Sequence, residues 1–267
     1  MALLTAFRVS QYVPASSLLH RLDARTKILA AALLVLCALL VQPWAYPGLA
    51  VLLAAGTLAG RLPWRLMWQT YRYIVLALVV GGLVTAILFP GSVLVHLIGP
   101  AAISREGALL GIRLVGQLTL LAYTTGLLTM TTAPLALTSG LQRLLGWLAR
   151  FGVPVEEIAL IITLSLTFLP LIQQQLDRVL TAQLARGADF RTGSWETRGR
   201  NALALFTPLL VSNLRRAEDL ALAMEARGYR VGARRTHLQV QVMVRRDYIF
   251  LALVAAIAVG TYVLWSG

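Results

Sequence analysis

Residues 28–60 read ILAAALLVLCALLVQPWAYPGLAVLLAAGTLAG, a run of 33 residues without one Asp, Glu, Lys or Arg. An isolated charge costs about 2.5–3.5 kcal/mol at the centre of a membrane, so charge-free stretches are candidate membrane spans. Over the whole chain only 13% of the residues are charged, against roughly 25% in a soluble domain. The sequence therefore predicts an all-α polytopic membrane protein.

The prolines and the glycine of residues 42–48, QPWAYPG, break this run in two. Such residues interrupt a helix far more often than they continue it. We therefore expect two short spans that are joined by a tight turn. Each is short against the roughly 20 residues that cross a bilayer, so a re-entrant hairpin is the alternative.

Further stretches without charged residues predict three more spans, which gives about five transmembrane helices in total. These stretches are 73–104, 114–142 and 248–267. The third span begins near Tyr73 and ends at Phe89-Pro90-Gly91. A short amphipathic piece follows to Pro100. We expect the fourth span over residues 107–131, and the fifth over the last stretch.

The basic residues predict the orientation of these spans. Four of them precede the first span and three separate the second span from the third: Arg8, Arg21, Arg25 and Lys27, then Arg61, Arg65 and Arg72. The positive-inside rule places both groups in the cytoplasm, with the N-terminus inside and the C-terminus outside. The net charge of +13 thus indicates membrane topology, and we expect no nucleic acid partner. We also expect no cleavable signal peptide.

Residues 134–247 hold 15 arginines and nine acidic residues, and this charge places them in the cytoplasm as well. The chain is thus divided into an N-terminal membrane domain with four spans over 1–133, a cytoplasmic region of long helices over 134–247, and a C-terminal transmembrane helix over 248–267. The middle region has too many charged residues to span the membrane, yet it is too apolar to be an ordinary soluble loop.

Two long amphipathic helices are expected in the middle region. One begins after Pro154, with two acidic residues in its first turn, and runs toward Leu184. The other runs from about Arg200 to Ala226, with a kink at Pro208. The apolar stretch Ile158–Ile172 could instead form a sixth span, although an even number of spans would disturb the charge orientation.

Both helices end in the same pattern. Residues 182–187 read AQLARG and residues 223–228 read AMEARG, two copies of A-x-x-A-R-G that lie 41 residues apart. A glycine just past the last helical residue stops a helix, because it enters the left-handed conformation without a Cβ penalty. The arginine then projects from the tip, where its planar fork of five donors suits carboxylates and carbonyls, and the alanine allows a partner to approach closely.

An arginine followed by glycine at a helix end is also ordinary capping. Capping alone does not require the arginine twice, so the pair favours two equivalent receptors over two unrelated caps.

With these motifs the chain resembles the transmembrane (T) component of energy-coupling factor transporters, which are micronutrient importers related to ABC transporters. The resemblance covers nearly the whole chain. Further segments resemble the family and follow in the order that the family has: Leu19–Lys27, Arg105-Glu106-Gly107, Thr131–Pro134 and Ala223–Tyr229. One departure is Thr167, which stands before Phe168-Leu169-Pro170 where the family often has an arginine.

The resemblance implies a non-catalytic energy-coupling subunit of an importer for a vitamin or a metal ion such as cobalt or nickel. Its partners would be two ATPase subunits, identical or different, and one substrate-binding (S) component in the bilayer. The ATPase-coupling residues would be Ala185, Arg186, Gly187, Ala226, Arg227 and Gly228, and the S-component contacts Gly81, Gly82, Pro134, Leu141 and Leu145. No cofactor would bind to this chain, because ATP and Mg would bind to the ATPases. The location would be the cytoplasmic (inner) membrane of a bacterium or archaeon.

Other classes of protein fit the residues less well. The sequence has no H-E-x-x-H, no G-x-S-x-G and no P-loop, and its one cysteine and three histidines form no metal-binding pattern. An ion-coupled carrier usually has acidic residues within its spans, which are absent here. Arg113, in the predicted fourth span, is a functional candidate because it is an intramembrane charge, although we expect its side chain to extend toward the headgroups. A secondary carrier or a membrane scaffold that acts without ATPases is the alternative function.

Overall fold

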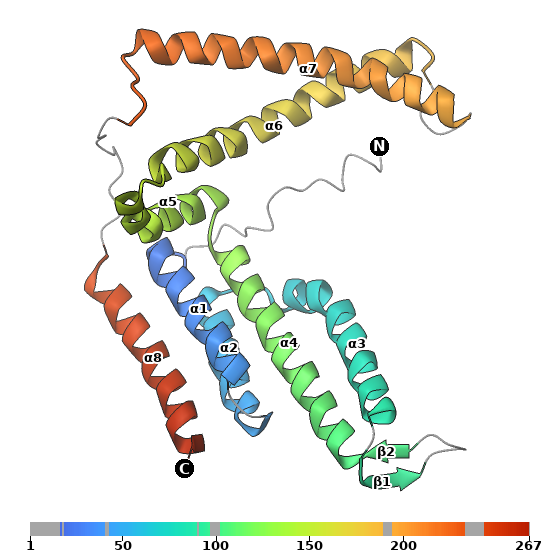
Figure 1. Cartoon of the computed structure of the whole chain (residues 1–267), viewed down its shortest axis with the longest axis vertical. Coiled ribbons are helices and arrows are strands. Elements are labelled where there is room, and N and C mark those ends of the chain that lie inside the picture. Colours follow the sequence, from blue (N-terminus) through green and yellow to red (C-terminus); the bar gives the residue numbers. More distant parts are fainter. Residues whose placement is uncertain are drawn as a thin grey trace. The chain divides into compact units, whose positions relative to one another are not determined.

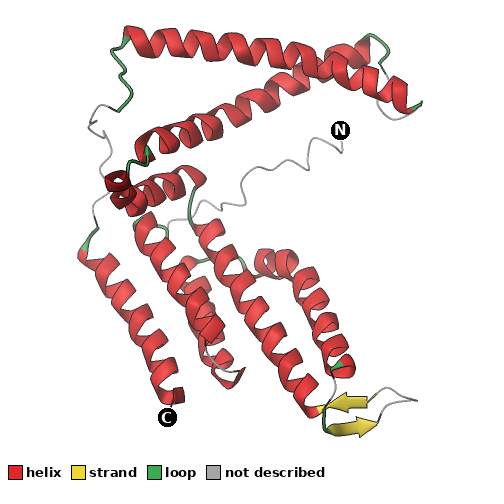
Figure 2. Cartoon of the chain, in the orientation of Figure 1, coloured by secondary structure: helices red, strands yellow, loops and turns green. Residues whose placement is uncertain are grey.

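The computed structural model describes residues 17, 19–40, 43–89, 91–96, 102–188, 194–232 and 243–266 (Figures 1 and 2). Within these residues the regular elements are helices and two short strands. An all-α membrane protein is thereby confirmed. The chain divides into two compact units, one formed by Met1–Leu144 and Gln239–Gly267, the other by Leu145–Leu238.

The first unit contains most of the apolar helices. Its elements are α1 (Ala24–Leu40), the 3-10 turn η1 (Pro43–Ala45), α2 (Tyr46–Gly60), α3 (Trp64–Leu88), β1 (Val93–His96), β2 (Ala102–Ser104), α4 (Arg105–Thr131), α5 (Pro134–Leu144) and α8 (Arg245–Ser266). The predicted break of the first apolar run is confirmed, since α1 and α2 are separate helices with η1 before α2. Helix α3 begins at Trp64, well before the predicted Tyr73, because Pro63 precedes a helical turn that tolerates the charged Arg65 and Arg72.

The N-terminal ends of α1 and α4 are capped by side chains. Asp23 precedes α1, and its Oδ1 accepts a hydrogen bond from the amide of Arg25 at 2.9 Å. Ser104 precedes α4, and its Oγ accepts from the amide of Gly107 at 3.0 Å. Each cap satisfies one of the amides that a helix start leaves without a partner.

Helices α3 and α4 pack closely through a pair of glycines. Gly82 and Gly111 face each other so closely that a Cβ on either would collide with the other helix. Small residues allow transmembrane helices to approach in this way. On α3 the neighbouring Gly81 has open space where its side chain would be. The two adjacent glycines therefore differ in role.

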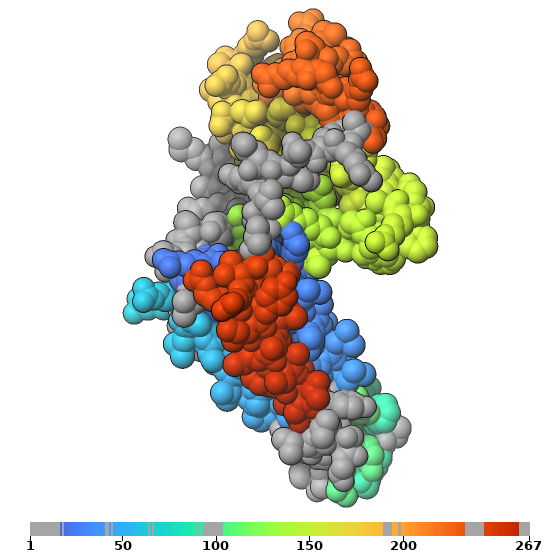
Figure 3. All heavy atoms as spheres, turned by 90° about the vertical axis from the view of Figure 1, so that its left-hand side faces the viewer, coloured from blue at the N-terminus to red at the C-terminus, as the bar shows by residue number. Residues whose placement is uncertain are grey.

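The core of the first unit joins α1, α2, α4 and α8. Cys37, Leu49, Leu53, Leu120 and Ala258 are buried together there. Figure 3 shows α8 lying against α1. The predicted C-terminal transmembrane helix thus packs on the first predicted span, and both belong to one compact unit.

Between α3 and α4 the structure has a pair of strands where the sequence predicted an amphipathic piece. Strand β1 pairs with β2 in the antiparallel sense, with Val95 opposite Ile103. Alternating β-branched residues favour extended pairing over a helix here. Glu106 in the first turn of α4 connects the helix to the residue before β1, because its Oε2 accepts a hydrogen bond from the amide of Ser92 at 2.7 Å.

The second unit consists of the 3-10 segment η2 (Leu145–Phe151), α6 (Val155–Ala185) and α7 (Trp195–Ala226). Both long helices of the middle region are confirmed, and α7 begins at Trp195, ahead of the predicted Arg200. Pro208 lies inside α7. Helix α5, which the sequence placed in the middle region, belongs to the first unit, where Gly140 packs against Ala24 of α1.

Three of the described helices are long and apolar enough to cross a membrane. They are Met67–Leu88 within α3, Arg105–Thr131 and Val155–Ala185. The first two agree with the predicted third and fourth spans. The last is α6, which the sequence assigned to the cytoplasmic region, with a sixth span as the alternative. The number of spans therefore stays a prediction.

Candidate functional site

The two A-R-G motifs end α6 and α7 with the same backbone geometry. At the end of α6, the amide of Gly187 donates to the oxygen of Leu184 at 3.0 Å, and the amide of Ala188 donates to the oxygen of Gln183 at 3.0 Å. At the end of α7, the amide of Gly228 donates to the oxygen of Glu225 at 2.9 Å, and the amide of Tyr229 donates to the oxygen of Met224 at 3.0 Å. This pairing of bonds is the Schellman motif, and both helices therefore stop in the same way.

The glycine of each motif adopts a conformation that disfavours a side chain. Its φ is +82° at Gly187 and +75° at Gly228. No other atom lies within 4 Å of a Cβ built at either position. The glycines are thus required by the backbone conformation and not by crowding.

The arginines are the last residues before these glycines, and both are exposed. Their neighbouring alanines and glycines are exposed as well. We call Ala185-Arg186-Gly187 and Ala226-Arg227-Gly228 the two arginine tips. Each tip presents a guanidinium beside small residues, which leaves room for a partner's surface to approach the backbone.

The two arginine tips lie at opposite ends of the helix pair. Helices α6 and α7 run in opposite directions and cross near the end of α6 (Figure 1). At the crossing, Nε2 of Gln183 donates to the oxygen of Ala204 at 3.4 Å. At the other end, the amide of Gly232 donates to Oε1 of Glu157 at 2.9 Å. The chain after Arg227 is thereby fixed to the first turn of α6.

The residues expected to contact an S component are found in both units. Gly81 in α3 is open to a neighbour, whereas Gly82 is already covered by α4. In α5, Pro134 is half-buried and Leu141 is 43% exposed. Leu145 begins η2 in the second unit and is half-buried. Leu141 is therefore the exposed member of this set, and Gly81 has open space at its Cβ position.

Two single residues that the sequence analysis singled out lie on helix surfaces. Arg113 in α4 is exposed, and its main-chain oxygen accepts a hydrogen bond from the hydroxyl of Tyr46 at 3.5 Å. Thr167 in α6 is exposed, and its Oγ1 donates to the oxygen of Thr163 at 2.8 Å. Thr167 thus binds a carbonyl of its own helix.

A cluster of buried charged residues escaped the sequence analysis. Asp23, Lys27 and Asp247 are all less than a tenth exposed, although α1 and α8 are far apart in the sequence. Oδ1 of Asp247 accepts from the amide of Asp23 at 2.9 Å, and Nζ of Lys27 donates to the oxygen of Thr131 at 3.0 Å. The local sequence hinted at this cluster only through Lys27, the single lysine of the chain, which follows the helix-capping Asp23 by four residues. Among the described residues, no group of three His, Cys, Asp or Glu side chains could hold a metal ion.

This geometry defines a class of protein: a helical membrane protein with two matched, exposed arginine tips. Residues 15–238 match the profile of the family described as CbiQ, cobalt transport protein. The chain is 37% identical over 254 residues to the energy-coupling factor transporter transmembrane protein EcfT of Thermosediminibacter oceani, covering 95% of this chain and 96% of that relative. It is 39% identical to the EcfT protein of Heliobacterium modesticaldum (93% and 94% covered) and 34% identical to that of Bacillus subtilis (90% and 91% covered). The chain therefore belongs to this family and is the transmembrane component of an energy-coupling factor transporter, embedded in a membrane.

Proposed function

We propose that this chain transmits ATP-driven movement of two ATPase subunits to a substrate-binding S component, which then releases a vitamin or a metal ion into the cell. The observation that carries the proposal is the identical capping geometry of Arg186 and Arg227. Two equivalent tips suit a pair of equivalent or closely related receptors. The proposal makes this chain a non-catalytic subunit, with ATP and Mg bound in the ATPases.

Each arginine tip is suited to dock into a groove on one ATPase. A guanidinium forms charge-assisted hydrogen bonds with carboxylates and carbonyls. The Schellman geometry fixes where the backbone ends, so the position of each guanidinium follows the axis of its helix. Movement of an ATPase would therefore be transferred to α6 or α7 as a whole.

The polar second half of α6 supports a location outside the bilayer. Three consecutive glutamines, Gln173–Gln175, are followed by Asp177 and Arg178. A helix that crossed the membrane over its full length would place such residues in hydrocarbon at a cost of several kcal/mol. We therefore assign α6 and α7 to the cytoplasmic face of the inner membrane of a bacterium or archaeon, with the start of α1 on the same side.

An exposed apolar surface is available for the S component. On α3, Leu76, Val80 and Leu83 are each more than half exposed. Gly81 lies on this helix, and in α5 Leu141 offers a further apolar contact. Because lipid is as apolar as a partner's helix, close packing at small residues such as Gly81 would decide the contact. Pro134 and Leu145 complete the proposed set of S-component contacts. Gly82 would act indirectly, because it packs against α4 and so holds α3 in place.

The proposal is tested by purifying the full chain in detergent from its own host and identifying the proteins that accompany it. We expect two ATPase subunits and one small membrane protein with the wild type, and loss of the ATPases with the double variant Arg186→Ala/Arg227→Ala. The control is Arg178→Ala/Arg215→Ala, which removes one exposed arginine from each helix but leaves both tips intact.

A well-folded wild-type chain that brings down no ATPase would overturn the proposal and favour a carrier or a scaffold. Equal loss of the ATPases from the control variant would show that general positive charge holds them, and not the tips. The small membrane protein would also identify the class of substrate.

A further inference from the structure

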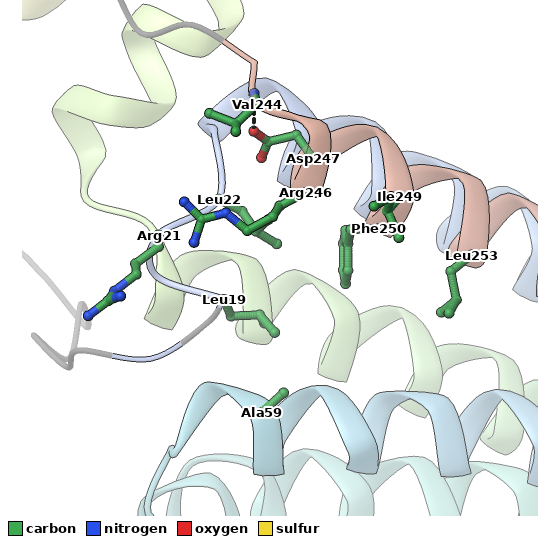
Figure 4. A pocket seen from close by; sticks show the side chains of 10 residues that line it. All are labelled: Leu19, Arg21, Leu22, Ala59, Val244, Arg246, Asp247, Ile249, Phe250 and Leu253. Carbon is green, nitrogen blue, oxygen red and sulfur yellow. Dashed lines mark hydrogen bonds between the residues drawn. The ribbon is translucent and has the colours of Figure 1, made fainter.

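The first unit contains a pocket that the proposed function does not use. It lies between the start of α8, the end of α2 and the residues that lead into α1, and its volume is about 340 Å³ (Figure 4). Its walls are mostly apolar, with Leu22, Ala59, Phe250 and Leu253 among the lining residues. In Figure 4 the ring of Phe250 extends from α8 into the space above Ala59. The pocket therefore offers a narrow apolar space between helices.

Two arginines lie at one end of this apolar space. Arg21 and Arg246 both line the pocket, and both are exposed. In Figure 4 the guanidinium of Arg246 lies near Leu22 and the side chain of Arg21 extends outward beside it, whereas Leu253 lies at the opposite end. Within the part of the chain that the structure describes, neither of these two guanidinium groups forms an ion pair with a carboxylate.

Asp247, the acidic residue that lines the pocket, is hydrogen-bonded to main-chain amides and not to the two arginines. Asp247 is 4% exposed. Its Oδ1 accepts from the amide of Asp23 at 2.9 Å, and its Oδ2 accepts from the amide of Val244 at 2.8 Å. Its charge is also close to that of buried Lys27, which interacts with it. The net charge presented at the mouth of the pocket is therefore positive.

The charge pattern at the start of α8 indicates that the pocket lies where a membrane changes from headgroups to hydrocarbon. Arg245, Arg246 and Asp247 are the last charged residues before the uncharged stretch 248–267. Phe250 and Leu253 follow one and two turns further along α8, toward the membrane interior. A ligand that fills the pocket would thus have a negative group at one end and a hydrocarbon chain at the other. Basic pockets between transmembrane helices bind anionic lipid headgroups.

We propose that this pocket binds one anionic phospholipid, with its phosphate between Arg21 and Arg246 and an acyl chain along Leu22, Phe250 and Leu253. The lipid would join α8 to α2, which otherwise face each other across the pocket. The site does not depend on the proposed coupling to ATPases, because it is formed within the first unit alone.

Native mass spectrometry of the full chain in a neutral detergent tests this proposal. The chain is incubated with phosphatidylglycerol or with phosphatidylcholine of the same acyl chains, and the bound fraction is measured at each lipid concentration. We expect one tightly retained phosphatidylglycerol and no retained phosphatidylcholine. Arg21→Gln and Arg246→Gln should each weaken the retention about fivefold, the effect of one basic residue near an anionic surface. Arg245→Gln is the matched control, since Arg245 is exposed beside Arg246 but does not line the pocket.

A second variant addresses the apolar part. Ala59→Phe should fill the space above α2 and abolish retention although both arginines are present. Equal retention of the two lipids by the wild type would overturn the proposal, and so would equal loss in Arg245→Gln and Arg246→Gln. Retention of phosphatidylglycerol by a monodisperse Ala59→Phe chain would show that the lipid binds elsewhere. If that variant aggregates, the two single arginine variants, which alter exposed side chains, decide the question.

Discussion

Lys27 donates a hydrogen bond from Nζ to the main-chain oxygen of Thr131 at 3.0 Å, which joins the first turn of α1 to the last residue of α4. Carbonyl groups at a helix end have no partner within the helix, and a cation there also interacts favourably with the helix dipole. The ammonium group is buried near Asp23 and Asp247. The three ends of α1, α4 and α8 are thus held together by one group of charges.

Replacing Lys27 with Met should destabilise the first unit by about 2 kcal/mol, because it leaves an oxygen and two buried carboxylates without their cation. The thermal unfolding midpoint of the chain in detergent measures this effect. Arg65→Met is the control, since Arg65 is exposed at the start of α3 and should leave the midpoint unchanged. Equal midpoints for Lys27→Met and the wild type would show that the buried charges contribute nothing.

Replacing Gly111 with Ala should separate α3 from α4, since the new methyl group would collide with the backbone of Gly82. A forced adjustment of packed helices of this kind costs about 1–3 kcal/mol. Gly81→Ala is the matched control, because nothing lies within 4 Å of its Cβ position. The unfolding midpoint should fall only for Gly111→Ala. A fall of the same size in both variants would contradict the close packing of α3 and α4 at Gly82 and Gly111.

Replacing Gly187 or Gly228 with Ala should disturb the arginine tips without unfolding the helices. Each glycine has a positive φ, where a Cβ costs about 1–2 kcal/mol. We expect the variants to insert normally and to bind the ATPases more weakly. Gly199→Ala is the control, since Gly199 lies within α7 with open space around it and alanine favours a helix there. Unchanged ATPase binding in Gly187→Ala and Gly228→Ala would mean that the Schellman geometry has no part in docking.

Local signals in the sequence predicted the parts of the structure that depend on neighbouring residues. The two A-R-G helix ends follow from glycine's access to positive φ, and the separation of α1 from α2 follows from Pro43 and Pro47. The separation of charged and uncharged stretches was enough to predict a helical membrane protein. Each of these features is decided within a few residues of the chain.

Features that depend on distant residues could not be predicted in this way. Asp23 and Asp247 meet across 224 positions, and neither residue differs locally from an ordinary helix cap. The apolar stretches contain many glycines, and their spacing alone did not distinguish Gly82, which packs against α4, from Gly81, which does not. The strands β1 and β2 pair within a short apolar segment, where helix and strand patterns are hard to distinguish.

The affinity of the full chain for its purified ATPase pair tests the central claim most directly. The claim is that Arg186 and Arg227 each dock into one ATPase. Loss of charge-assisted hydrogen bonds at one tip should weaken binding by about tenfold or more, and loss at both tips by about a hundredfold. We therefore expect a dissociation constant about a hundredfold higher for Arg186→Ala/Arg227→Ala and an unchanged value for Arg178→Ala/Arg215→Ala. A double variant that binds the ATPases as tightly as the wild type would contradict the account and reduce the two motifs to helix caps.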